Sequence, residues 1–384
     1  MVGIATATCL AVLATAAPAQ APADTVFTVE RRVELGSRLP ETSALAFSEG
    51  RLYTINDSRD GRLYQVDTLT GAVVGSRRLT DGDNEDWEAL ALRGDTVYVG
   101  DFGNNARGNR RDLRILRFYL GADTAALPPV DTIGFSYAEQ VDFAPAPANT
   151  TDFDAEAMAV TPDSIYVFTK EWSRLGTAVY ALPNAAGQHV ARMRGRLDSI
   201  GLITDADYRP GDSLLVLSGY SPALQPFVYA GYGFRGRDFF GGRAARAQVD
   251  LPFHQVEGIG SLDGRRYFLS NERFERSIVL VPQALSVLDL GGLLDGLRRG
   301  GTSATQEGLS PKRGLHARPN PTDSTVWVSG SRAGERYDLR DAAGRQVLSG
   351  TQAADDLRLD FRALPQGTYL LRTEHGGTVS IVRR

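Results

Sequence analysis

One pattern recurs five times along the chain and constrains the fold more than any other feature. A polar residue opens a short run of small and apolar residues, a turn follows, and a second run reaches a tyrosine or leucine ten residues after the opening residue. Another polar residue follows three positions later. The opening residues are Ser43, Glu88, Glu156, Asp205 and Glu257. A register repeated this often indicates an internal repeat.

The spacing and periodicity of the repeats predict an all-β fold. Successive opening residues lie 45 to 68 residues apart, which fits one four-stranded antiparallel blade with or without an insertion. Apolar residues alternate with period two, and Gly, Asp and Asn occupy the turns, so repeats built from helix pairs are excluded. We therefore expect a five-bladed β-propeller, a ring of sheets with only short free edges.

The expected blades follow the repeats. They span about residues 43–80, 88–137, 156–196, 205–250 and 257–282. Because the last segment has room for only three strands, the alternating stretch at 25–35 is expected to supply the fourth and to join the ends of the ring. A six-bladed ring is the alternative, with the extra blade around residues 225–250.

Composition divides the chain into four segments. Residues 1–21 are an apolar run that ends in small residues, which is typical of a signal peptide; the run is too short for a transmembrane anchor, and Pro18 interrupts it. Residues 22–285 are expected to form the propeller, followed by a linker at 286–312, with a short helix within 284–297. Residues 313–384 carry short alternating strands, which predict a small immunoglobulin-like β-sandwich.

Charge, cysteine content and missing motifs narrow the function classes. The formal net charge of −4 gives no reason to expect nucleic acid or an anionic membrane as a partner. The single cysteine, Cys9, lies in the N-terminal apolar run, so the mature chain would carry no disulfide and no reactive thiol. The sequence has no Gly-x-Ser-x-Gly motif and no histidine cluster with metal-ligand spacing. Whether the chain is an enzyme stays open.

The last segment resembles a known export signal. Pro319-Asn-Pro, Tyr337-Asp-Leu, Leu364-Pro-Gln-Gly-Thr-Tyr and a basic final strand follow one another in order up to the C-terminus. In these motifs the segment resembles the type A sorting domain of the type IX secretion system of Bacteroidetes. The resemblance implies passage through the outer membrane, the type IX secretion machinery as a partner, and a secreted or cell-surface location.

The repeat region also resembles a known family. Four stretches carry the likeness: Trp87-Glu-Ala-Leu, Ala155-Glu-Ala-Met, Leu214-Leu-Val-Leu-Ser and Val256-Glu-Gly-Ile. They resemble the SdiA-regulated family and, more loosely, the esterase-like phytase propellers. The resemblance implies a propeller scaffold and a calcium site, and it does not imply a particular reaction.

The acidic opening residues predict a metal site. The first strand of each blade lines the channel of a propeller, so Glu88, Glu156, Asp205 and Glu257 should converge at one channel mouth. Carboxylates held this close repel one another unless they are protonated or neutralised by a cation. Ca²⁺ is the expected cation because it prefers oxygen ligands. The alternative is that each carboxylate accepts backbone N–H bonds from the next blade and acts only as a structural link.

Two further groups of residues are weaker candidates. Loops after the second strand of each blade carry polar and aromatic side chains that suit an anionic or sugar-like ligand at the rim, or that simply pack the loops: Asn56, Asp57, Asp101, Asn104, Lys170, Trp172 and Asn271. His254, three residues before Glu257, is a candidate general base, with a purely structural role as the alternative.

Two function classes therefore remain open. The first is a secreted or cell-surface propeller with a calcium site at the channel mouth and a binding or scaffold role. The second is a calcium-dependent hydrolase of phosphate or carboxylic esters, similar to a phytase or lactonase. An open pocket with a base beside the cation would favour the hydrolase.

Overall fold

The chain is nearly all β-strand in the residues that the structure describes. The computed structural model describes residues 26–82, 84–121, 126–276, 279–299, 315–329, 334–342, 345–352, 357–373 and 378–384. The expected signal peptide at 1–21 lies outside these residues, as does the part of the expected linker from residue 300 to 312. Within them, α1 (Gly291–Arg299) is the one α-helix.

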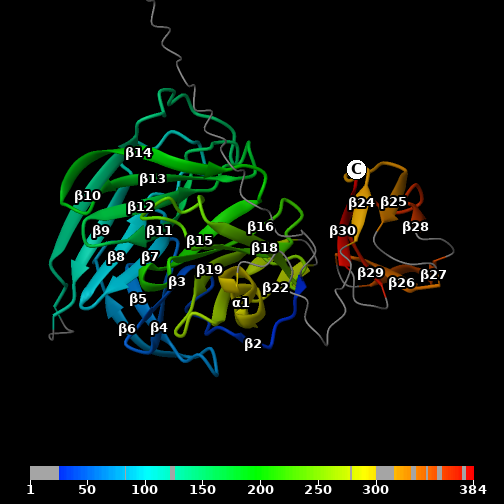
Figure 1. Cartoon of the computed structure of the whole chain (residues 1–384), viewed down its shortest axis with the longest axis horizontal. Coiled ribbons are helices and arrows are strands. Elements are labelled where there is room, and N and C mark those ends of the chain that lie inside the picture. The colour runs from blue at the N-terminus through cyan, green and yellow to red at the C-terminus, as the bar shows by residue number, and fades with distance from the viewer. Residues whose placement is uncertain are drawn as a thin grey trace, which may run out of the picture.

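Four-stranded antiparallel units repeat between residues 42 and 289 (Figure 1). The first contains β3 (Thr42–Ser48), β4 (Arg51–Asn56), β5 (Arg62–Val66) and β6 (Val73–Arg78). The second contains β7 (Trp87–Arg93), β8 (Thr96–Asp101), β9 (Arg114–Tyr119) and β10 (Val130–Tyr137). The third contains β11 (Ala155–Val160), β12 (Ser164–Thr169), β13 (Thr177–Pro183) and β14 (Gly187–Leu197).

The fourth and fifth units recruit strands from the N-terminus. The fourth contains β15 (Leu202–Arg209), β16 (Leu214–Tyr220), β17 (Pro226–Tyr232) and β18 (Arg243–Val249), with β1 (Val26–Phe27) parallel to β18. The fifth contains β19 (Val256–Gly260), β20 (Arg266–Asn271), β23 (Ala284–Asp289) and β2 (Arg31–Glu34). A hairpin of β21 (Phe274–Arg276) and β22 (Val279–Val281) interrupts this unit. The segment 225–250, proposed above for a sixth blade, forms β17 and β18 of the fourth unit.

The first strands of the units gather at the centre. Each of β3, β7, β11, β15 and β19 contacts the next, and β19 returns to contact β3. β10 and β14 pair in parallel at the outside, so the second and third units form one eight-stranded sheet. Because its end strands β7 and β11 are also in contact, this sheet nearly closes on itself.

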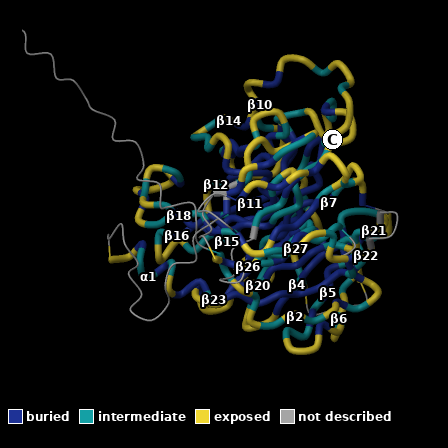
Figure 2. Tube along the Cα trace, turned by 90° about the vertical axis from the view of Figure 1, so that its right-hand side faces the viewer, coloured by how far each residue is buried: buried dark blue, intermediate teal, exposed yellow. Residues whose placement is uncertain are grey.

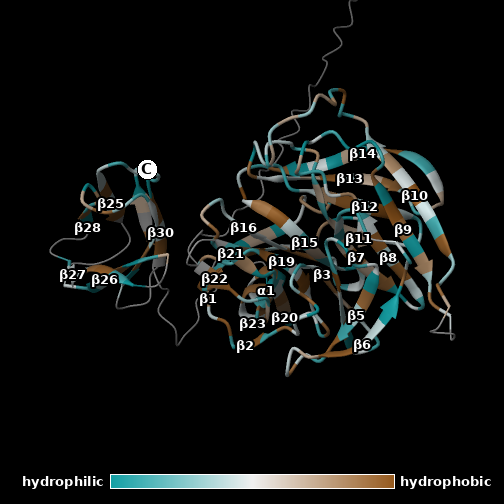
Figure 3. Cartoon of the chain, turned by 180° about the vertical axis from the view of Figure 1, so that it is seen from behind, coloured by the Kyte–Doolittle hydropathy of each residue, from teal (hydrophilic) through white to brown (hydrophobic). Residues whose placement is uncertain are grey.

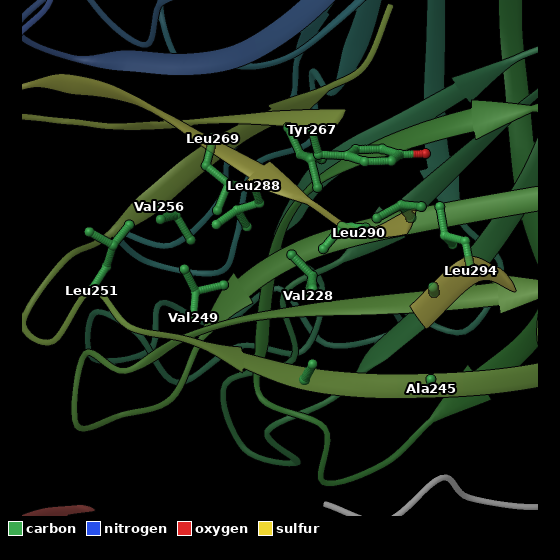
Figure 4. Packing of buried hydrophobic residues seen from close by; sticks show 14 of the residues in the cluster. Val228, Ala245, Val249, Leu251, Val256, Tyr267, Leu269, Leu288, Leu290 and Leu294 are labelled. Carbon is green, nitrogen blue, oxygen red and sulfur yellow. The ribbon is translucent and has the colours of Figure 1, made fainter. Parts of the chain in front are cut away.

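Hydrophobic clusters lie between consecutive units all round the ring in the described residues, including between the fifth and the first. Figure 4 shows the cluster between the fourth and fifth units, where Val228 and Val249 lie opposite Leu269 and Leu288. The innermost strands are buried on both faces, whereas the outer strand β6 alternates between half-buried and exposed residues. Figures 2 and 3 show the same contrast, with buried, apolar strands and exposed, polar turns.

The C-terminal end of this ring lies later in the chain than the sequence predicts. The expected third strand of the fifth unit ended before Pro282, and a helix was expected within 284–297. The third strand is instead β23 at Ala284–Asp289, and only the residues after it are helical. Leu288, Leu290, Leu294 and Leu297 pack into the cluster between the fourth and fifth units. The ring as a whole therefore extends through α1, past the expected boundary at 285.

The C-terminal segment forms two further sheets around a core of its own. One contains β24 (His316–Arg318), β25 (Thr325–Ser329) and β28 (Leu357–Asp360). The other contains β27 (Gln346–Thr351), β26 (Arg336–Asp341), β29 (Gly367–Thr373) and β30 (Thr378–Arg383). Both sheets contribute to one hydrophobic cluster that includes Val326, Leu359, Leu339 and Leu371.

Candidate functional site

The innermost strand of each unit carries a β-bulge at one position. The residue left out of the ladder is, in chain order, Ser43, Glu88, Glu156, Thr204 and Glu257. A bulged residue is unpaired, and the bulge re-aims its side chain. In four units this residue is the polar residue that opens the sequence repeat.

A cavity of about 150 Å³ whose lining residues are all polar or charged lies beside four of these bulges. Its floor consists of buried residues: Thr42, Ser43, Glu88, Glu156, Lys170 and Glu257. Its mouth consists of half-buried residues: Glu41, Asp57, Asn105, Gln255 and Glu272. Six of the lining side chains are carboxyl groups and one is an ammonium group. We call this space the acidic cavity.

Lys170 supplies a cation to the floor of the cavity. Its Nζ lies 3.2 Å from Glu156 Oε2 and 4.0 Å from Glu257 Oε2. The same Nζ lies 5.2 Å from the centre of the Trp172 ring and 5.1 Å from that of Tyr220, within the range of a cation–π interaction. Burial lowers the pKa of Lys170, but the neighbouring carboxylates more than compensate and hold it well above its usual value. The ammonium group therefore stays charged.

Burial raises the pKa of several carboxyl groups of the cavity. Burial, followed by the charges of neighbouring carboxylates, raises the pKa of Glu88 and Glu156 well above the usual range. Burial also raises the pKa of Glu257, against the effect of Lys170. At the mouth, burial and then neighbouring carboxylates raise the pKa of Asp57 to about 7 and that of Glu272 to about 8. Near neutral pH Asp57 and Glu272 at the mouth therefore hold protons that a cation could replace.

Two carboxylate oxygens are left unpaired at the cavity. Glu156 is 1% exposed, and its Oε1 has no hydrogen-bond partner among the described residues. Asp57 Oδ1 is buried as well and has no partner in that part of the chain. Because burying an unpaired polar atom costs free energy, a hydrogen bond from water or from a bound ligand to these oxygens would be stabilising.

Asp205 does not join the other three predicted metal ligands. Its Oδ2 accepts the backbone N–H groups of Leu45 (3.2 Å) and Ile259 (2.8 Å), and its Oδ1 accepts that of Ala206 (2.8 Å). In this unit the bulge falls at Thr204, one residue earlier, and a shift of one residue turns a side chain to the opposite face. Asp205 is therefore the structural link between β3, β15 and β19 that the sequence left as an alternative.

Of the seven predicted rim residues, two line the acidic cavity and five do not. Asp57 and Lys170 line the acidic cavity. The others are not among its lining residues and make hydrogen bonds inside the protein: Asn56, Asp101, Asn104, Trp172 and Asn271. Asp101, for example, accepts hydrogen bonds from the guanidinium groups of Arg110 and Arg114 at 3.0 and 2.7 Å. These residues pack the loops, which was the alternative interpretation.

His254 lies away from the lining of the cavity. Its Nδ1 is 2.9 Å from the carbonyl oxygen of Pro252, and burial lowers the pKa of the imidazole. The neighbouring Gln255 lines the cavity instead and donates a hydrogen bond to the Tyr220 hydroxyl at 3.3 Å. The structure therefore gives His254 no contact with the cavity carboxylates.

Glu41 and Glu272 were not among the predicted site residues. Glu272 follows the last residue of β20, as Lys170 follows the last residue of β12 and Asp57 the last residue of β4. The three are equivalent in the structure because each directly follows the second strand of its unit. Counted from the opening residue, however, Asp57 and Lys170 lie 14 residues on and Glu272 lies 15 residues on, so the sequence register points to Asn271 instead. Glu41 lies two residues before the first bulge, and Asp86 and Asp154 hold the same position before Glu88 and Glu156, so aligning this position would have identified Glu41.

The arrangement does not fit the predicted four-carboxylate calcium site. Asp205 is turned away, and the Lys170 ammonium group lies against Glu156 and Glu257. Within the described ranges, no three Asp, Glu, His or Cys side chains lie close enough together to hold one metal ion. Binding of Ca²⁺ by this protein remains a prediction.

The raised pKa values predict an unusual pH dependence of stability. Asp57 and Glu272 have folded-state pKa values of about 7 and about 8 against usual values of 3.8 and 4.5. Between these values the folded protein binds more protons than the unfolded chain, so their contribution to stability is present at low pH and lost as pH rises through the folded values. The variant Asp57→Asn/Glu272→Gln should therefore lose less stability than the parent between about pH 5 and about pH 8.

Thermal melts at several pH values measure this difference. We expect the double variant to gain roughly 5 °C in melting temperature relative to the parent at the upper end of the range, since one pKa unit corresponds to about 1.4 kcal/mol. Glu139→Gln, in an exposed turn, is the control and should follow the parent. Identical pH profiles for the parent and the double variant would contradict the raised pKa values.

Comparisons with known proteins identify the C-terminal segment. Residues 317–384 match the family described as the secretion system C-terminal sorting domain. No curated protein matches the chain in sequence. No helix in the described residues has the length and apolar character needed to cross a membrane.

Similar solved structures are distant. PorZ, a surface component of the type IX secretion system of Porphyromonas gingivalis, is 12% identical with a TM-score of 0.32, over 91% of this chain and 47% of PorZ. The chain thus spans about half the length of PorZ. A protein of unknown function from Dyadobacter fermentans is 10% identical with a TM-score of 0.39, over 68% of this chain and 98% of that one. These scores are too low to support an argument about fold or function.

The described residues and the family match together define a class of protein: a nearly all-β ring with an acidic cavity at its centre, followed by a C-terminal sorting domain. That domain marks the chain as a secreted or outer-surface protein handled by the type IX secretion system.

Proposed function

We propose that this chain is an exported binding protein whose ring is a five-bladed β-propeller and whose acidic cavity takes up a cationic ligand. The observation that carries the proposal is the set of six carboxyl groups around about 150 Å³ of polar space, with Lys170 as the cation among the lining residues. Carboxylates that share a cavity shielded from water repel one another, so a bound cation stabilises them.

The proposal also includes the number of blades in the ring and the fold of the C-terminal sheets. Clusters between consecutive units and contacts of β19 with β3 support a closed ring of five blades. A likeness to SdiA-regulated and phytase-type propellers agrees with this architecture, and the two C-terminal sheets suit an immunoglobulin-like sandwich. The binding protein could act as a scaffold on the cell surface, where its ring is presented to soluble ligands.

The hydrolase alternative has less support. A hydrolase of phosphate or carboxylic esters needs a base beside the cation. His254, the candidate for that base, bonds to Pro252 and does not line the cavity. The described residues offer no specific observation in favour of ester hydrolysis.

Binding of a cation should stabilise the protein. A ligand that binds only the folded state adds about 2.7 kcal/mol to the free energy of unfolding at 100 times its dissociation constant. The protein, first treated with EDTA, is melted with Ca²⁺, Mg²⁺ and a set of small organic ammonium and guanidinium salts at constant ionic strength. At least one cation should raise the melting temperature, and Glu88→Gln/Glu257→Gln should remove most of that increase.

The exposed substitution Glu139→Gln serves as the control and should leave the increase unchanged. If no inorganic or organic cation raises the melting temperature beyond the effect of Na⁺, the acidic cavity is structural and the proposed function falls.

A further inference from the structure

The acidic cavity is larger than one metal ion requires. Its volume is about 150 Å³, and a cavity of that volume accommodates a molecule of about six non-hydrogen atoms, such as benzene. Calcium draws its oxygen ligands in to about 2.3–2.6 Å. In the part of the chain that the structure describes, the acidic side chains are not gathered so tightly in any group of three. The carboxylates are distributed around a space that fits a small molecule.

The surroundings of the Lys170 ammonium group are an example of how an organic cation can be held in this cavity. Its ammonium group lies between the carboxylates of Glu156 and Glu257, and the rings of Trp172 and Tyr220 lie against it. Carboxylates and aromatic rings together are a favourable environment for an alkylammonium or guanidinium group. The part of the cavity next to Glu257, Trp172 and Tyr220 is therefore already occupied by the side chain of Lys170.

Two buried carboxyl oxygens at the cavity, Glu156 Oε1 and Asp57 Oδ1, have no hydrogen-bond donor among the described residues. Glu156 Oε1, on a residue that is 1% exposed, has no partner among the described residues. The half-buried carboxyl groups of Glu41, Asp57 and Glu272 surround the mouth. An occupant with several N–H donors would satisfy the unpaired oxygens of Glu156 and Asp57. The Lys170 ammonium group repels any cation at Glu156, but it repels a divalent metal ion about twice as strongly as a single ammonium or guanidinium group at the same distance.

We propose that the acidic cavity binds a small organic cation with N–H donors, an alkylammonium or alkylguanidinium group, whose charged end reaches Glu156 Oε1 between the mouth residues Asp57 and Glu272. The inference rests on the proposed function and specifies its ligand. Carboxylates hold such groups by charge-assisted hydrogen bonds, and a guanidinium group can bind a carboxylate in a bidentate manner.

The cation has two possible sources: a free small molecule, or the side chain of an arginine or lysine in a polypeptide. Isothermal titration of the full-length chain separates them. The probes are agmatine and propylamine as free cations, and a short capped peptide with one arginine. Tetramethylammonium, which has no N–H donor, and CaCl₂ are the comparison ligands.

We expect agmatine or the arginine peptide to bind, and Asp57→Asn/Glu272→Gln to weaken the binding by about tenfold or more, because two half-buried acceptors of the cation are lost. Glu156→Gln should weaken it similarly. Glu139→Gln should leave it unchanged. If Glu156→Gln does not fold, as judged by its melting curve, the half-buried mouth variants still provide the test.

Three results would overturn the inference. Binding of Ca²⁺ without binding of any N–H cation would leave the proposed function intact and remove the organic ligand. Equal binding of tetramethylammonium and agmatine would show that N–H donors are not recognised. Failure of every cation to bind would remove both the inference and the proposed function.

Discussion

Replacing Lys170 by methionine should lower the free energy of unfolding by about 3–5 kcal/mol, the usual cost of removing one partner from a buried ion pair. Lys170 is 4% exposed, and the substitution leaves the carboxylates of Glu156 and Glu257 without their nearest cation. The effect is measured by chemical denaturation at neutral pH. Near about pH 5 the cost should shrink, since protonation of the carboxyl groups removes the unpaired charge.

A double-mutant cycle separates this effect from lost packing. Lys170→Met combined with Glu156→Gln should show a coupling energy of about 1–3 kcal/mol. Arg273→Met removes the cation of an exposed pair with Glu275 at 2.8 Å and should change stability by less than about 1 kcal/mol. If Lys170→Met is as stable as the parent, the lysine is not the counter-cation of the cavity, and the carboxyl groups are neutral without it.

Removing residues 26–34 should destabilise the ring by roughly 5 kcal/mol or cause aggregation. β2 pairs with β23 from Ala284 to Val287, and Val33 packs at the interface of the fifth and first units. Loss of these hydrogen bonds, at about 1 kcal/mol each, and of the buried apolar side chains accounts for the magnitude. The deletion also exposes the edge of β23 to pairing with other chains.

A chain that ends at Arg299 is the matched control. It removes the C-terminal sheets, which have a hydrophobic core of their own, and leaves every strand of the ring. Its melting temperature should agree with the ring transition of the full-length chain. Should the N-terminal deletion prove as stable as this control, the ring is not closed by β2.

The fold was predictable where the sequence repeats itself. The ten-residue spacing from Glu88 to Tyr98 identifies a strand, a turn and a second strand, and β7 and β8 form that hairpin. The assignment of the alternating stretch 25–35 to the fifth unit is confirmed only in its second part: β2 pairs with β23, whereas β1 pairs with β18 of the fourth unit. The stretch from Ala284 was less clear, since a short apolar run suits a buried strand as well as a buried helix.

The site was harder to predict because it depends on single-residue shifts. Glu156 and Asp205 hold the same place in the sequence repeat, yet the bulge at Thr204 turns Asp205 to the backbone of β3 and β19. The sequence periodicity does not reveal that the bulge of the fourth unit lies one residue earlier than in the other units. The role of Lys170 as counter-cation also depends on where its loop places it, between carboxylates from two different units.

The bulged positions allow side chains at the centre of the ring to change while the strand pairing is kept. Because each bulged residue stands outside the hydrogen-bonded ladder, its side chain can be exchanged with little effect on strand pairing. In the described units these positions now hold two hydroxyl residues, Ser43 and Thr204, and three glutamates. Related chains with the same cores could therefore present a neutral, basic or more acidic centre through one substitution at a time, and the ligand would change while the scaffold stayed the same.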